Sequence, residues 1–342
     1  MTEYTRPQSF DFGAATGQGF NLPAGKGYLF RVAAWSAFLL VIVYAILGIP
    51  VFKGFMGMIS GAIEMEHSLT GADPDPEQVM AMMAPLFKAM GFIMLISLFQ
   101  MAVFAAAETA IYRNLFHQED RGIFPLRFGV DEWRVLGTRI VIGFILGGVY
   151  MGVYLLAILI GAILFGLADA SGSGILAALG GILIFALIIA AIAAFVWIAV
   201  RLAPASAYSV KRRAFDPFAS WKPMEGLVWP AIGSFLILYV VGYFILGFVM
   251  MIVFLIFFLS SGLLGVFMEL DETGEAMPDF TPLMDQVTSA GFIIPLLIAI
   301  FVSLFLTLIW YGAIWSMWGY MAKDKLPSTD TDPQTWRPDG QV

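Results

Sequence analysis

Ionisable side chains within apolar segments are the first candidates for chemistry, because a charge in hydrocarbon is costly and is usually kept for a pathway. The sequence offers almost none. Glu108 lies about one turn before Tyr112 near the end of one apolar run, and Arg201 follows Val200 at the matching end of another. We expect these two to reach the membrane surface or to form a structural ion pair, in preference to a proton relay.

The other residue types that perform chemistry occur without a recognisable pattern. Cysteine is absent, which excludes disulfides and thiolate sites, and no phosphate loop, serine-centred turn or zinc helix is found. Thioethers are numerous between Met56 and Met101, where Cu(I) binding is one interpretation and packing of a helix face is the favoured one. We therefore predict no catalytic residue, no metal site and no cofactor.

The same segment suggests a helix start. Pro76 follows Asp75, and Met80, Met83, Phe87 and Met94 recur at helical spacing, so we expect a helix that begins after Asp75 and buries this face. Acidic residues nearby lack the spacing of a calcium loop, which favours solvated surface.

Composition decides which solvent surrounds most of these residues. Hydrophobic residues make up 60% of the chain and charged residues 13%, against roughly 25% in soluble domains. Six apolar runs reach the roughly 20 residues that cross a bilayer. They are Tyr28 to Phe52, Leu86 to Tyr112, Val135 to Leu167, Ile175 to Val200, Leu227 to Met268 and Phe292 to Met321. The sequence predicts an all-α integral membrane protein with six transmembrane helices.

Two of these runs need comment. The turn formers in Asp169 to Gly174 predict a short connection between spans three and four. The run from Leu227 to Met268 would make a helix of about 63 Å, yet it lacks a residue on which to turn, so we expect one tilted span.

Basic residues predict the topology, because cytoplasmic loops carry the excess of Lys and Arg. If the spans form three hairpins of the same orientation, 16 of the 18 basic residues lie on one side, leaving Lys53 and Lys88 opposite. We expect residues 1–27 to be a flexible cytoplasmic tail, 28–322 the six-helix domain and 323–342 a polar cytoplasmic tail. The returning spans end alike at Tyr112, Tyr208 and Tyr320, and both a true repeat and coincidence stay open.

Small residues in the third span predict a close helix contact. Gly143, Gly147, Gly148 and Gly152 form two pairs spaced four residues apart, which lets another helix approach closely. Packing within the six-helix bundle is the favoured interpretation, and a dimer interface is the alternative.

A family resemblance rests on Arg201-Leu-Ala-Pro204, followed by Phe218-Ala-Ser-Trp221 and a new span at Val228. Between Val200 and Trp229 the chain resembles uncharacterised bacterial six-helix proteins similar to the glycerophosphoryl diester phosphodiesterase membrane domain. That membrane domain can accompany a separate catalytic barrel. Such a barrel needs far more residues than lie outside the six apolar runs. The resemblance implies a six-helix fold and not catalysis.

The expected function follows from the six apolar spans and from the lack of a catalytic motif. We expect a non-enzymatic protein of the bacterial inner membrane, with both termini cytoplasmic, acting as a membrane-organising, lipid-associated or accessory subunit. The lipid bilayer is its expected partner and nucleic acid is not, while a protein partner or a homo-oligomer stays open. A small-solute permease or channel is the alternative, and a polar cavity reaching Glu108 or Gln100 would favour it.

Overall fold

The computed structural model describes residues 11–25, 27–68, 75–120, 122–262, 286 and 289–323. All regular elements of the described residues are helical. They are α1 (Phe12–Gly17), η1 (Gln18–Phe20), α2 (Tyr28–Ser68), α3 (Pro76–His117), α4 (Val130–Ser171), α5 (Gly174–Leu202), α6 (Ala205–Arg212), α7 (Val228–Ser260) and α10 (Ala290–Lys323). Within these residues six helices, namely α2, α3, α4, α5, α7 and α10, are long and apolar enough to cross a membrane. The chain is an all-α, multi-pass membrane protein.

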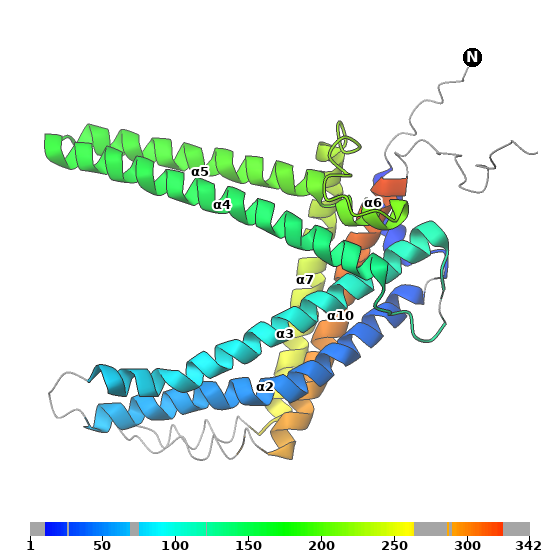
Figure 1. Cartoon of the computed structure of the whole chain (residues 1–342), viewed down its shortest axis with the longest axis horizontal. Helices are drawn as coiled ribbons and strands as arrows, with labels where there is room; N and C mark the ends of the chain where they lie inside the picture. Colours follow the sequence, from blue (N-terminus) through cyan, green and yellow to red (C-terminus); the bar gives the residue numbers. More distant parts are fainter. Residues whose placement is uncertain are drawn as a thin grey trace, which may run out of the picture.

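The long helices lie side by side as antiparallel neighbours (Figure 1): α2 with α3, α4 with α5, and α7 with α10, which also packs against α2. The three pairs meet at one end, which we call the base, where α3 is joined to α4 and α5 to α6. From the base, the α2–α3 pair and the α4–α5 pair diverge, so that they form a V in Figure 1. The helices share an end without forming a parallel bundle.

The local signals for helix ends are confirmed. Asp75 caps α3 by accepting a hydrogen bond from the Glu77 amide at 3.1 Å, with Pro76 as the first helical residue. Residues 169–174 form the expected tight connection, in which Gly172 ends α4 at φ +61°. α7 is one helix from Val228 to Ser260, and the last residues of the predicted span, 263–268, lie outside the described part of the chain.

The buried core lies at the base. Tyr112, Tyr208 and Leu29 are among its largest fully buried side chains, whereas most large apolar residues of α4, α5 and α7 are exposed. Apolar surface exposed over such lengths suits lipid, which is as apolar as the side chains themselves. Among the residues that the structure describes, the base is therefore the part that resembles the interior of a soluble protein.

The N-terminal segment is more ordered than expected. Residues 11–20 form α1 and η1 against α7 and α10, with Ala15 fully buried and Gly19 tight against Ala313. The expected flexible tail is thus wrong for residues 11–25, because contacts with other helices order a segment that has no strong local signal. Residues 1–10 and 324–342 lie outside the described residues.

The close helix contact occurs in a different place from the one predicted. A Cβ at Gly143, Gly147, Gly148 or Gly152 would meet nothing within 4 Å, so these glycines pack against no described part of the chain. A Cβ at Gly54 on α2 would instead lie 2.6 Å from Ala89 Cβ and 2.7 Å from Pro85 O on α3. Small residues allow a close approach, but the position of the neighbouring helix decides where one occurs.

The methionine face of α3 also differs from expectation. Met80 and Met94 are 63% and 66% exposed, so the face does not pack against the protein. Helical spacing identifies an apolar face, but in a membrane protein such a face also suits lipid. Packing within the chain was therefore the wrong interpretation for these two side chains.

Candidate functional site

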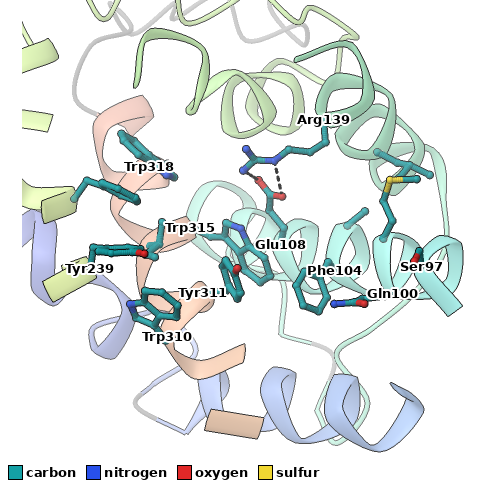
Figure 2. A pocket seen from close by; sticks show the side chains of 15 residues that line it. Ser97, Gln100, Phe104, Glu108, Arg139, Tyr239, Trp310, Tyr311, Trp315 and Trp318 are labelled. Atoms are coloured by element: carbon teal, nitrogen blue, oxygen red, sulfur yellow. Dashed lines mark hydrogen bonds and ion pairs between the residues drawn. The ribbon is translucent and has the colours of Figure 1, made fainter. Parts of the chain in front are cut away.

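The charged centre of the base is built around Glu108 on α3 (Figure 2). Its Oε2 accepts a hydrogen bond from Arg139 Nε at 3.0 Å, and its Oε1 accepts one from Arg139 Nη2 at 2.5 Å. Tyr112 and Ser206 also donate hydroxyl hydrogen bonds to Oε1, at 2.9 and 2.6 Å. The Glu108 side chain is 3% exposed, so its charge is compensated within the protein.

This arrangement corrects the expected partner of Glu108. Arg201 forms no ion pair in the described structure; its guanidinium carbon lies 4.7 Å from the Trp197 ring centroid and 4.5 Å from that of Trp221. Flat guanidinium groups stack well on indole rings, which accounts for an Arg side chain without a carboxylate. Glu108 instead pairs with Arg139, because α4 crosses α3 at the base.

Sequence reasoning therefore missed Arg139, Ser206 and Tyr112 as parts of one network. A signal existed for Arg139, which lies inside the apolar run that begins at Val135. No comparable signal marks Ser206. It belongs to α6, in a segment interpreted only as a cytoplasmic connection, and it is fully buried.

A second ionic cluster lies next to the first. Arg113 forms a salt bridge with Glu132, and both side chains are 2% exposed. Glu132 also accepts a hydrogen bond from the Gly129 amide at 2.8 Å, which caps the start of α4. The Arg113–Glu132 bridge ties this start of α4 to the end of α3. Arg127 lies 3.5 Å from Glu119 and 3.7 Å from Glu132. These contacts hold the connection between α3 and α4 and so fix the point from which the two helices diverge.

A cavity of about 570 Å³, which we call the apex pocket, lies beside the Glu108–Arg139 pair (Figure 2). This volume is in the range of small-molecule sites. Four helices line it: α3 with Ser97, Gln100, Met101, Phe104, Ala105 and Glu108, α4 with Leu136 and Arg139, α7 with Phe235 and Tyr239, and α10 with Trp310, Tyr311, Ile314, Trp315 and Trp318. It follows α3 from Glu108 to Ser97, a rise of roughly 16 Å.

Two donors on the pocket wall have no hydrogen-bond acceptor among the described residues. The Arg139 side chain is 31% exposed, and within the described residues its Nη1 makes no hydrogen bond. Gln100 accepts a hydrogen bond from Tyr44 at 3.2 Å, and its amide nitrogen has no acceptor among the described residues. Glu108 is covered, so the group that a ligand meets is the outer edge of a guanidinium.

Much of the remaining wall is aromatic. Phe104 lies 5.5 Å from Tyr311 and 6.1 Å from Trp315, while Tyr239 lies 5.6 Å from Trp310, all between ring centroids. Trp310 Nε1 donates to Leu238 O at 3.1 Å, so its indole is fixed by α7. Such rings give a rigid apolar surface next to a polar end, which suits an amphiphilic molecule.

In the described part of the chain no group of three His, Asp or Glu residues is placed to hold a metal ion. Comparison of the sequence and structure with protein-family models, curated proteins and solved structures finds no match.

Proposed function

We propose that this chain is a non-enzymatic, lipid-associated protein of the bacterial inner membrane that holds an amphiphilic lipid in the apex pocket. The observation that carries the proposal is the free edge of Arg139 at one end of a cavity with many aromatic side chains in its wall. Gln100 lines the same cavity about two turns further along α3 from Glu108. A lipid phosphate or carbonyl oxygen would accept hydrogen bonds from these donors. Its chain would lie against Phe104, Tyr311 and Trp315.

The basic residues support an orientation with the base on the cytoplasmic side. Arg31, Arg113 and Arg134 all belong to helix ends at the base, as do the basic residues of α6. In this orientation both termini are cytoplasmic. The pocket would then lie just inside the cytoplasmic leaflet, with its aromatic walls at the depth of lipid chains. The segment from Val200 to Trp229 resembles six-helix proteins similar to the glycerophosphoryl diester phosphodiesterase membrane domain. This resemblance fits such a membrane protein and adds no catalytic role.

Photocrosslinking of the full chain tests the proposal. The protein is placed in lipid nanodiscs that contain a phosphatidylethanolamine with a diazirine in one acyl chain, illuminated, digested and mapped by mass spectrometry. We expect labelling of α3 around 97–105 and of α10 around 310–318 that saturates and is competed by unlabelled lipid. Lipid that merely surrounds the helices would neither saturate nor compete.

Two tryptophan substitutions on neighbouring residues give a matched comparison. Ser97→Trp places an indole in the mouth of the pocket, whereas Leu98→Trp adds the same side chain at an exposed position outside the pocket lining. The proposal requires that Ser97→Trp reduce pocket labelling at least fivefold and that Leu98→Trp leave it unchanged. Equal labelling in both variants and the unmodified chain would overturn lipid binding at this site.

One observation favours a second candidate function, a small-solute permease. The apex pocket reaches both Gln100 and Glu108, the polar groups expected along a transport pathway. The aromatic walls and the covered carboxylate fit a lipid better than a hydrated solute. Solute uptake by reconstituted vesicles that Ser97→Trp abolishes and Leu98→Trp preserves would replace the lipid proposal with transport.

A further inference from the structure

Two lysines in the half of the α2–α3 pair away from the base share a second cavity. Among the described residues Lys53 and Lys88 are the only basic residues far from the base, and both line a cavity of about 690 Å³ between α2 and α3. Its other lining residues are Ile49, Pro50, Gly54, Ala81, Ala84, Pro85 and Phe92. We call this the lysine cavity. Lysine is rare on the side away from the cytoplasm, so their meeting in one cavity needs a physical explanation.

The two lysines occupy equivalent positions in matching sequences. α2 contains Pro50-Val-Phe-Lys53-Gly54, and α3 contains Pro85-Leu-Phe-Lys88-Ala89. The close contact between Gly54 and Ala89 brings the ends of these two sequences together. In antiparallel helices this register puts the Cα atoms of Lys53 and Lys88 within about 3 Å of each other along the helix axis. The pairing therefore gathers two positive charges at one level of the membrane.

No anion of the described protein compensates these charges. Both lysines are exposed, and neither forms a hydrogen bond or ion pair within the part of the chain that the structure describes. Two like charges at one level repel each other, and an anion placed between them removes that cost. Among the described residues, the cavity thus has the charge that suits an anion.

The depth of the lysine cavity indicates which anion. Tyr28 lies at the base, where its hydroxyl donates to Ala110 O. Lys53 is 25 residues further along α2, a rise of about 38 Å, which exceeds the roughly 30 Å of a hydrocarbon core. If the base is at one membrane surface, the lysines are at the headgroup level of the other. Ile49 and Phe92 lie at the same cavity and provide apolar contact for a lipid.

We propose that Lys53 and Lys88 bind a phosphate group, supplied by an anionic phospholipid of the leaflet opposite the base. The ammonium groups donate hydrogen bonds to the phosphate oxygens, and the apolar lining contacts the glycerol and the start of the chains. The site is distinct from the apex pocket, because the two cavities share no lining residue and the lysine cavity lies nearer the N-terminus of α3.

The experiment measures binding of phosphatidylglycerol to the full chain in phosphatidylcholine nanodiscs or mixed micelles, by native mass spectrometry and by the rise in unfolding temperature. K53Q/K88Q removes both charges, K53R/K88R keeps them, and K222Q removes an exposed lysine elsewhere in the chain. We expect K53Q/K88Q to weaken phosphatidylglycerol binding at least tenfold and the other two variants to bind as the unmodified chain does. The unfolding temperature without added lipid shows that each variant is folded.

A parallel measurement with inorganic phosphate distinguishes recognition of the phosphate group from recognition of the whole lipid. Binding of both phosphate and phosphatidylglycerol, each lost in K53Q/K88Q, would support recognition of the phosphate itself. Binding of phosphatidylglycerol alone, lost in the same variant, would support recognition of the whole lipid. Equal phosphatidylglycerol affinity in K53Q/K88Q and the unmodified chain at low salt would overturn the proposal and leave two lysines that merely extend into water.

Discussion

Glu108 on α3 binds Arg139 on α4 through two hydrogen bonds, 2.5 and 3.0 Å long, next to the point where the two helices diverge. Glu108→Gln should lower the free energy of unfolding by about 1 to 3 kcal/mol, which is less than for a fully buried pair because Arg139 is partly exposed. A double-mutant cycle with Arg139→Gln, measured by unfolding in mixed micelles, should give a coupling energy above about 0.5 kcal/mol.

Arg201 supplies the control for this cycle. Because it lies between two tryptophan rings and not beside Glu108, Arg201→Gln combined with Glu108→Gln should show additive losses. Coupling of Glu108 to Arg201 that exceeds its coupling to Arg139 would contradict the arrangement of the base.

The Arg113–Glu132 bridge should be the most sensitive ion pair of the two clusters. Glu132→Gln leaves Arg113 buried without its main partner, so we expect a loss of about 3 to 5 kcal/mol. Asp120→Asn breaks the Arg31–Asp120 bridge, whose side chains are 35% and 39% exposed, and should cost about 0 to 1 kcal/mol. The free energies of unfolding of the two variants are compared in mixed micelles. Equal losses would mean that burial does not determine how much each salt bridge stabilises the protein.

Two glycines should respond differently to the same change. Gly54→Ala forces its Cβ against Ala89 and the Pro85 carbonyl, so the α2–α3 pair must shift and the unfolding temperature should fall. Gly147→Ala adds a methyl group in open space, where helix propensity favours Ala by up to about 1 kcal/mol. A destabilised Gly147→Ala, with loss of an oligomer in size-exclusion chromatography, would instead favour the predicted dimer interface.

The topology can be tested directly because the chain has no cysteine. A cysteine at position 213, which follows α6, should be labelled by an impermeant maleimide only after the cell membrane is opened. A cysteine at position 272, in the segment after α7, should be labelled in intact cells, since the asymmetry of basic residues places it outside. Reversed labelling of the two positions would refute a cytoplasmic base.

The amino-acid sequence determined the features that depend on local chemistry and on lipid as solvent. The six spans follow from the length and polarity of the apolar runs, and the start of α3 follows from Asp75 and Pro76. The single span of α7 follows from the lack of a residue on which to turn. Each of these signals acts within a few helical turns, so no knowledge of neighbouring helices is needed.

Only the tertiary structure decided which side chains meet. Arg201 and Arg139 both lie near the ends of apolar runs, yet the crossing of α3 and α4 makes Arg139 the partner of Glu108. Glycine spacing alone did not distinguish the open face of α4 from the close contact at Gly54. The apex pocket draws its walls from four helices separated along the chain. In a membrane, apolar faces are satisfied equally by lipid or by protein, so hydrophobicity fixes the spans but leaves their packing to shape and charge.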